Sequence, residues 1–224
     1  SRGLGDVYKR QNKMAVALFG GTFNPVHNGH LRVASELAEL LPISELRMMP
    51  CGVPPHRDKK VVSAQQRMEM LQIGIGHDNP TLTIEDIELQ RTTPSYSIDT
   101  VNLIRRNLGP SVPLILCLGM DALASISNWH RWEQLLDFCH IAVSSRPGFA
   151  APKKGPLYEW INQHCCADLS KLEERPAGHI YFCDLTMLAV SSTIIRDKVK
   201  SKESIRYMTP DSVVNYIQQH RLYE

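Results

Sequence analysis

Two histidines and two glycines lie close together near the start of the sequence, in the stretch "GGTFNPVHNGHL" at residues 20–31. The stretch separates an apolar run, "MAVALF", from a segment with the apolar spacing of a helix, "LRVASELAELL". Gly20 and Gly21 permit a sharp turn close to a ligand, and the amides at the start of a helix attract anions. His27 and His30 are three residues apart, so both imidazoles fall on one face of the first helical turn. This pattern predicts a site where two imidazoles bind a polyphosphate whose charge shifts during a reaction.

A second stretch with anion-binding chemistry lies near the other end of the sequence, in "AVSSTIIRDKV" at residues 189–199. Ser191 and Ser192 can cap a helix that begins near Thr193 and offers its amides to an anion. Arg196 follows one turn into that helix, where its guanidinium can bind two phosphate oxygens. A capped helix without a ligand is the alternative interpretation of each stretch taken by itself.

Neither stretch is one of the widespread phosphate-binding loops. The first lacks the lysine and hydroxyl that complete GxxxxGK[ST], and it does not have the spacing of GxGxxG. The tetrad "HNGH" at residues 27–30 instead resembles the signature of the HxGH nucleotidyltransferase superfamily. "SSTIIR" at residues 191–196 resembles the second motif of that superfamily, which binds the triphosphate.

Three further segments narrow the resemblance to one family. They are "PPHR" at 54–57, "TPSYSIDT" at 93–100 and "GMDAL" at 119–123. In this order they resemble the bacterial nicotinate-nucleotide adenylyltransferases, from about Met14 to the end of the sequence. The resemblance implies an enzyme that transfers the adenylyl group of ATP to nicotinate mononucleotide. The products are nicotinate adenine dinucleotide, on the way to NAD, and pyrophosphate, and the reaction is an in-line displacement at the α-phosphate.

The resemblance also implies roles for individual residues. Catalysis would depend on His27, His30 and Arg196. ATP would be bound by these three and by Gly20, Gly21, Thr22, Phe23, Gly119, Asp121, Ser192 and Thr193. The residues around the mononucleotide would be His56, Arg57, Tyr96, Ser97, Trp129 and Arg146. Magnesium would accompany ATP and bridge its phosphates, so no protein residue is expected to be a metal ligand.

The sequence departs from the family pattern at a few of these positions. Asn24 stands where aspartate is common, Ser97 replaces a threonine and keeps the hydroxyl, and His130 stands where an aromatic residue is frequent. Cys51 and Gly52 replace a polar pair.

Other functions are alternatives. The acceptor could be nicotinamide mononucleotide or phosphopantetheine, or the chain could be a cytidylyltransferase, although "TPSYSIDT" and "PPHR" argue against the last two. A nucleotide-binding sensor without catalysis would not need the two histidines and Arg196. A zinc or redox module would use Cys165 and Cys166, but the six cysteines contain no CxxC pair.

The composition excludes several broad classes of protein. With 224 residues, of which 43% are hydrophobic, the chain is long enough for one globular domain with a sizeable core. A net charge of +2 argues against nucleic acid as a partner, and no apolar run reaches the length of about 20 residues that a membrane helix needs. Residues 1–13 are polar and basic and do not form a secretory signal. We expect them to be a disordered or non-native lead before a single domain at residues 14–224. Reduced cysteines indicate a cytoplasmic protein, and a homo-oligomer is left open.

The hydrophobic patterning indicates which elements must position these residues. Strands are predicted at 15–19, 45–50, 82–87, 113–118, 139–144 and 179–184, and helices at 28–41, 63–76, 97–107, 131–137, 156–165, 192–200 and 210–220. For the last helix, Thr209 is predicted as the N-cap and Pro210 as the first helical residue. Apolar strands that alternate with helices predict an α/β fold, a Rossmann-like doubly wound parallel sheet of the nucleotidyltransferase type with helices on both faces. In such a sheet, ligands bind beyond the carboxyl ends of the strands, where each of the motifs lies.

Overall fold

The computed structural model describes residues 15–52, 62–76, 79–91, 96–144 and 152–224. Its strands form one parallel sheet in the order β3-β2-β1-β4-β5-β6. They are β1 (Ala15–Gly21), β2 (Ile43–Pro50), β3 (Leu82–Ile84), β4 (Leu114–Gly119), β5 (His140–Ser144) and β6 (Ile180–Cys183). This is the strand order of a Rossmann fold, and it reverses direction between β1 and β4. The predicted fold class and all six predicted strands are confirmed.

The central strands are apolar on both faces because helices cover both sides of the sheet. In β1, Ala15 and Ala17 belong to one core, whereas Val16 and Leu18 belong to the other. Consecutive side chains of a strand point to opposite faces, so a strand buried on both sides must be apolar throughout. This is why strands such as "LILCL" were recognisable in the sequence.

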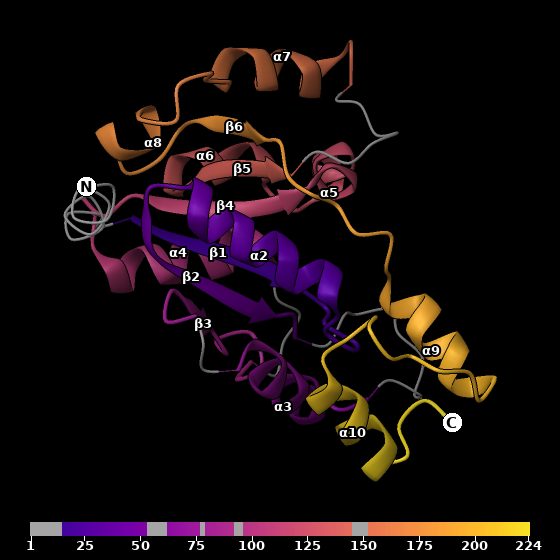
Figure 1. Ribbon diagram of the computed structural model, residues 1–224. Helices are drawn as coiled ribbons and strands as arrows, with labels where there is room; N and C mark the ends of the chain where they lie inside the picture. The colour runs from indigo at the N-terminus through magenta and orange to yellow at the C-terminus, as the bar shows by residue number, and fades with distance from the viewer. Residues whose placement is uncertain (1–14, 53–61, 77–78, 92–95, 145–151) are drawn as a thin grey trace, which may run out of the picture.

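Two layers of helices enclose the sheet (Figure 1). One layer contains α2 (Asn28–Leu40), α3 (Ala64–Ile75), α8 (Lys171–Glu174), α9 (Ser192–Lys200) and α10 (Asp211–Gln219). The other contains α4 (Ser97–Leu108), α5 (Met120–Ala124), α6 (Leu135–Phe138) and α7 (Pro156–His164). Figure 1 shows α9 and α10 together beside the C-terminus, with α10 near α3. The last segments of the chain therefore pack on the layer that begins with α2.

Two predicted helices differ from the structure. Residues 131–137 do not form one helix, because Arg131 has a left-handed backbone with φ of 52°. They form a 3-10 turn, η2 (Trp132–Gln134), followed by the short α6. The last helix begins at Asp211 with Pro210 as its N-cap, and the Thr209 hydroxyl donates instead to the carbonyl of Val26 at 2.8 Å.

Other elements were missed or overextended. The short helices α5 and α8 and the 3-10 turn η1 (Ile126–Asn128) were not predicted. The third strand ends at Ile84 rather than at residue 87, because the chain turns at residues 87–90. Within the described ranges, no helix combines the length and apolarity needed to span a bilayer.

The six cysteines are all free thiols, as the sequence predicts. Cys117, Cys139 and Cys183 are buried, whereas Cys165 is exposed. Burial raises the pKa of the Cys139 and Cys183 thiols to about 12, so both are protonated and unreactive at neutral pH.

His140 makes the stability of the fold depend on pH. It is fully buried on β5, where its Nε2 donates to the carbonyl of Arg175 at 2.8 Å and its Nδ1 accepts from the amide of His179 at 3.1 Å. Burial lowers the pKa of His140 from 6.5 to about 4. Between these values the unfolded chain binds a proton that the folded chain does not, so the free energy of unfolding falls as the pH falls.

We therefore expect the free energy of unfolding to decrease between pH 6.5 and pH 4, with a slope from His140 approaching about 1.4 kcal/mol per pH unit. In His140→Gln the slope should be shallower, because the titrating group is gone. Urea denaturation at several pH values measures both slopes. Equal slopes in the two proteins would contradict this assignment.

Candidate active site

A cavity of about 530 Å³ lies at the carboxyl ends of β1 and β4, the two strands at the switch point of the sheet. It brings together seven residues predicted for the site: Gly20, Gly21, Thr22, Ser97, Gly119, Asp121 and Trp129. Its other lining residues are Met49, Cys51, Gly52, Glu88, Val101, Leu116, Cys117, Leu118 and Ala122. Five of the expected ATP residues and two of the expected mononucleotide residues thus line one space, whereas six other expected ATP residues do not line it: Phe23, His27, His30, Ser192, Thr193 and Arg196.

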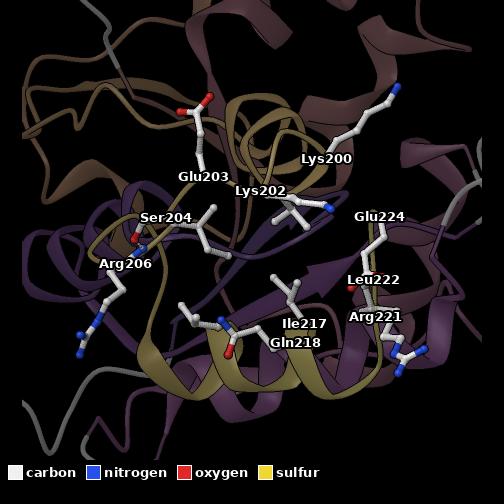
Figure 2. A pocket seen from close by; sticks show the side chains of 13 residues that line it. Lys200, Lys202, Glu203, Ser204, Arg206, Ile217, Gln218, Arg221, Leu222 and Glu224 are labelled. Carbon is white, nitrogen blue, oxygen red and sulfur yellow. Dashed lines mark hydrogen bonds between the residues drawn. The ribbon is translucent and has the colours of Figure 1, made fainter.

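A larger cavity, of about 830 Å³, lies between α9 and α10 (Figure 2). It contains none of the residues predicted for the site. Its floor includes Ile217 and Leu222, and its rim carries charges of both signs, such as Lys200 and Glu203. Its size alone does not indicate chemistry, so the smaller cavity at the switch point is the candidate site.

The two histidines form a stacked pair at the start of α2. His27 is the N-cap residue of this helix, and its Nδ1 accepts a hydrogen bond from the amide of His30 at 3.3 Å. The ring centroids are 3.6 Å apart and the ring planes differ by 19°. Because Nδ1 is an acceptor, the proton of neutral His27 is on Nε2, which is therefore a hydrogen-bond donor. The predicted arrangement of both imidazoles on the first helical turn is confirmed.

Packing orients the second ring of the pair. The Phe23 ring meets the His30 ring edge-on, with centroids 5.0 Å apart and planes at 83°. Phe23 is buried, and its backbone is left-handed with φ of 45°. Phe23 was predicted to contact the nucleotide. In this structure it supports the His27–His30 pair from inside the protein.

Gly29 is required by the packing of His27. A Cβ atom at residue 29 would lie 3.0 Å from Nδ1 of His27 and 3.1 Å from Cε1, closer than ordinary contact distances. The structure shows that the space is occupied by the imidazole itself.

The second motif contacts the first, although the two are more than 160 residues apart in the sequence. Arg196 donates from Nη1 to the carbonyl of Asn24 at 2.8 Å and from Nη2 to the Thr193 hydroxyl at 3.1 Å. Ser192 donates to the carbonyl of Pro25 at 2.9 Å. Ser191 caps α9 by accepting from the amide of Ile194 at 3.2 Å, and the helix spans residues 192–200 as predicted. Ser192 and Arg196 thus each donate to a carbonyl of the loop that leads to the histidines.

Residues expected around the mononucleotide are divided between several places. Ser97 and Trp129 line the cavity, whereas Tyr96 does not and has its ring 4.7 Å from that of His130. His56, Arg57 and Arg146 lie outside the residues that the structure describes.

Glu88 is a cavity residue that sequence reasoning missed. Its carboxylate is buried and accepts from the amide of Gly52 at 3.2 Å and from the Thr100 hydroxyl at 2.9 Å. It thereby joins the end of the β2 segment to α4. Glu88 stands in a polar run without a motif, so the sequence contained no signal for this role.

Arg67 is a second missed residue. It is 3% exposed and donates to the carbonyl of Thr22 at 2.7 Å and to that of Cys51 at 2.8 Å. These contacts hold together the loops that follow β1 and β2. In the sequence, Arg67 is one polar residue among several in "AQQRMEML", which is typical of a solvated helix surface.

We expect Gly29→Ala to lower the activity of this site by about 10²-fold, because the new methyl group displaces the His27 ring from its place at the helix start. A matched control is Ser35→Ala, which changes α2 at a position that contacts Glu39 rather than either histidine. Nucleotidyl-transfer rates of both variants provide the measurement. Wild-type rates for Gly29→Ala would show that the close approach of residue 29 to the His27 ring does not affect activity.

Comparisons with known proteins agree with this site. The cytidylyltransferase-like family model matches residues 18–198. A protein of Pseudomonas syringae pv. tomato named "Probable nicotinate-nucleotide adenylyltransferase" is 43% identical over 208 residues, which cover 93% of this chain and 93% of that protein. A protein of Serratia proteamaculans with the same name is 41% identical, covering 92% of this chain and 94% of its own length.

A solved structure shares the fold at low identity. It is the Plasmodium falciparum nicotinic acid mononucleotide adenylyltransferase complexed with NaAD, with a TM-score of 0.69, 21% identity, and coverage of 93% of this chain and 97% of that one. Together with the curated relatives and the motifs at the switch point, this identifies the family. The chain is a nucleotidyltransferase that belongs to the cytidylyltransferase-like family and, within it, to the nicotinate-nucleotide adenylyltransferases.

Proposed function

We propose that this enzyme transfers the adenylyl group of ATP to nicotinate mononucleotide, forming nicotinate adenine dinucleotide and pyrophosphate in NAD biosynthesis. The observation that carries the proposal is the stacked pair of His27 and His30 at the start of α2, next to the cavity at the switch point. The names of the relatives at about 40% identity support the same substrates.

The reaction is a direct displacement at phosphorus. A 5′-phosphate oxygen of the mononucleotide forms a bond to the α-phosphorus of ATP, and the bond to the bridging α–β oxygen breaks. That oxygen leaves with pyrophosphate, which carries the displaced charge. A phosphate is already a competent nucleophile, so catalysis consists of positioning the reactants and stabilising charge.

The residues of the site fit these tasks. His27 Nε2 and the His30 imidazole donate to the phosphates, and the positive end of the α2 helix dipole favours the same charge. Asp121 is the cavity carboxylate that can accept from ribose hydroxyls. Ser97 supplies a donor for the nicotinate carboxylate, and the Trp129 face supplies a surface for the cationic pyridine ring.

Arg196 acts on the phosphates together with the histidines in this proposal, and Ser192 and Thr193 complete that side. Their support is the position of α9, whose first residues touch the loop at residues 24–25. His56, Arg57, Tyr96 and Arg146 are assigned to the mononucleotide from the family motifs alone.

Magnesium enters the reaction with ATP. Among the residues that the structure describes, no three His, Cys, Asp or Glu side chains gather closely enough to hold a metal ion. Mg²⁺ commonly keeps several waters and binds substrate phosphates rather than an all-protein cage. The ion would neutralise phosphate charge. A reducing, cytoplasmic setting is part of the proposal and is supported by the six free thiols.

The substrate is tested by measuring pyrophosphate release from ATP and magnesium with three acceptors in parallel. We expect release with nicotinate mononucleotide and much slower release with nicotinamide mononucleotide or phosphopantetheine, because Ser97 offers a donor to a carboxylate. Release with phosphopantetheine alone would keep the displacement chemistry and reject the acceptor. No release with any acceptor would favour a nucleotide-binding sensor.

His30→Ala should reduce turnover by about 10²–10³-fold, the usual cost of removing one donor to transition-state charge. Binding of the mononucleotide should persist, because His30 does not line the cavity that contains Ser97 and Trp129. His220→Ala, at an exposed position after α10, is the matched control. Initial rates and calorimetric titration give the two quantities, and near-normal turnover of His30→Ala would refute the assigned role.

A further inference from the structure

The loop at residues 22–26, which joins β1 to α2, is held by side chains from distant parts of the chain. Its carbonyls accept from Arg67 (to Thr22), Arg196 (to Asn24), Ser192 (to Pro25) and Thr209 (to Val26), at 2.7, 2.8, 2.9 and 2.8 Å. All four donors belong to the helical layer of α3, α9 and α10 or to its connections. The loop conformation therefore depends on the second half of the chain.

A fifth contact reaches a side chain of the same loop. Tyr223 donates from its hydroxyl to Oδ1 of Asn24 at 2.7 Å, across 199 residues of sequence. Asn24 is 5% exposed, and no motif role is assigned to Tyr223. Burial raises the pKa of Tyr223, so its hydroxyl keeps the proton that it donates throughout the neutral range.

The backbone around Tyr223 is strained. Tyr223 has φ of 68° and Arg221 has φ of 49°, both in the left-handed region that non-glycine residues rarely occupy. Leu222, between them, is buried against the core, and it lines the cavity in Figure 2 together with Ile217. Strain of this kind persists only where the surroundings hold it, and it is typical of segments that serve a site.

Asn24 connects this segment to the histidines. Its neighbour Phe23, buried and left-handed, meets the His30 ring edge-on with the ring centroids 5.0 Å apart, and His30 stacks on His27 with centroids 3.6 Å apart. A shift of Asn24 would turn the backbone at Phe23 and release the edge contact to His30. The chain of contacts thus runs from the Tyr223 hydroxyl through Asn24 and Phe23 to the catalytic pair.

We propose that Tyr223 is a positioning residue for adenylyl transfer: its hydroxyl fixes Asn24 and thereby the loop that orients His30. The proposal rests on the proposed function for its kinetic readout. Tyr223 does not touch the reacting atoms, so its effect should fall on turnover rather than on binding of the mononucleotide.

Tyr223→Phe removes only the hydroxyl. We expect turnover to fall about tenfold because His30 is no longer held in place, while KM for the mononucleotide changes little and the melting temperature falls only by the few degrees that one lost hydrogen bond costs. Tyr158→Phe, on the outer face of α7, is the matched control and should behave as wild type. A loss of stability with unchanged turnover at a temperature where the variant is folded would overturn the proposal, since it would make the contact merely structural.

A double-mutant cycle with Asn24 tests the route. If Tyr223 acts through Asn24, then Asn24→Ala and the double variant Asn24→Ala/Tyr223→Phe should have the same turnover. Asn24→Asp keeps an acceptor for the Tyr223 hydroxyl and should retain turnover. Independent, multiplying effects in the double variant would overturn the route.

A readout that needs no activity separates this proposal from the proposed function. The side-chain NMR signals of His30 should shift in Tyr223→Phe and remain unchanged in Tyr158→Phe. Inactive wild-type protein with shifted His30 signals would reject the substrate assignment but support the positioning role. Active wild-type protein with unshifted His30 signals in Tyr223→Phe would reject the positioning role alone.

Discussion

Buried backbone carbonyls that lie outside a strand or helix must find other hydrogen-bond donors. In this enzyme that constraint applies to the loop at residues 22–26. Its carbonyls are paired with side chains of Arg67, Ser192, Arg196 and Thr209. Arg67 comes from α3, Ser192 and Arg196 come from α9, and Thr209 lies just before α10, so three separate segments together fix the loop conformation. That conformation determines where α2 begins, and the start of α2 determines the positions of His27 and His30.

The stacked pair also depends on how closely atoms can approach at the helix start. His27 is both the N-cap of α2 and a partner in the stack, and a side chain at residue 29 would collide with its ring. The parallel sheet adds the second half of the site, because β1 and β4 separate at their carboxyl ends and leave room for a ligand. Helix start and switch point therefore coincide in one place.

Sequence reasoning predicted what depends on local patterns. Apolar runs indicated all six strands, and Ser191, predicted as a cap, lies at a real helix start. Predictions from the sequence were wrong where a contact with a distant backbone group, or the backbone conformation of a single residue, determines the structure. Thr209 fits an N-cap by its neighbours, yet its hydroxyl is taken by Val26, and the break at Arg131 follows from a left-handed residue that no periodicity reveals.

The candidate site divides in the same way. The histidines, the glycines and Asp121 belong to motifs and were predictable, whereas Glu88 and Arg67 pair mainly with backbone groups of other segments. A polar residue whose partner is an amide or carbonyl far away leaves no trace in composition or spacing. Only the folded chain identifies it.

The contacts that hold the loop around Asn24 join residues far apart in the sequence, and this separation has a consequence for biosynthesis. Donors to this loop follow it by 167 to 199 residues, at Ser192, Arg196, Thr209 and Tyr223. During translation, the strand that carries the loop leaves the ribosome long before its partners exist, and a domain generally folds as a unit once its segments are available. The early half of the chain can thus pair its first strands while its loop is still unrestrained. These contacts can hold the loop only after residues 192–223 have emerged, so a nascent chain that has not reached them has the motif without the contacts that order its loop.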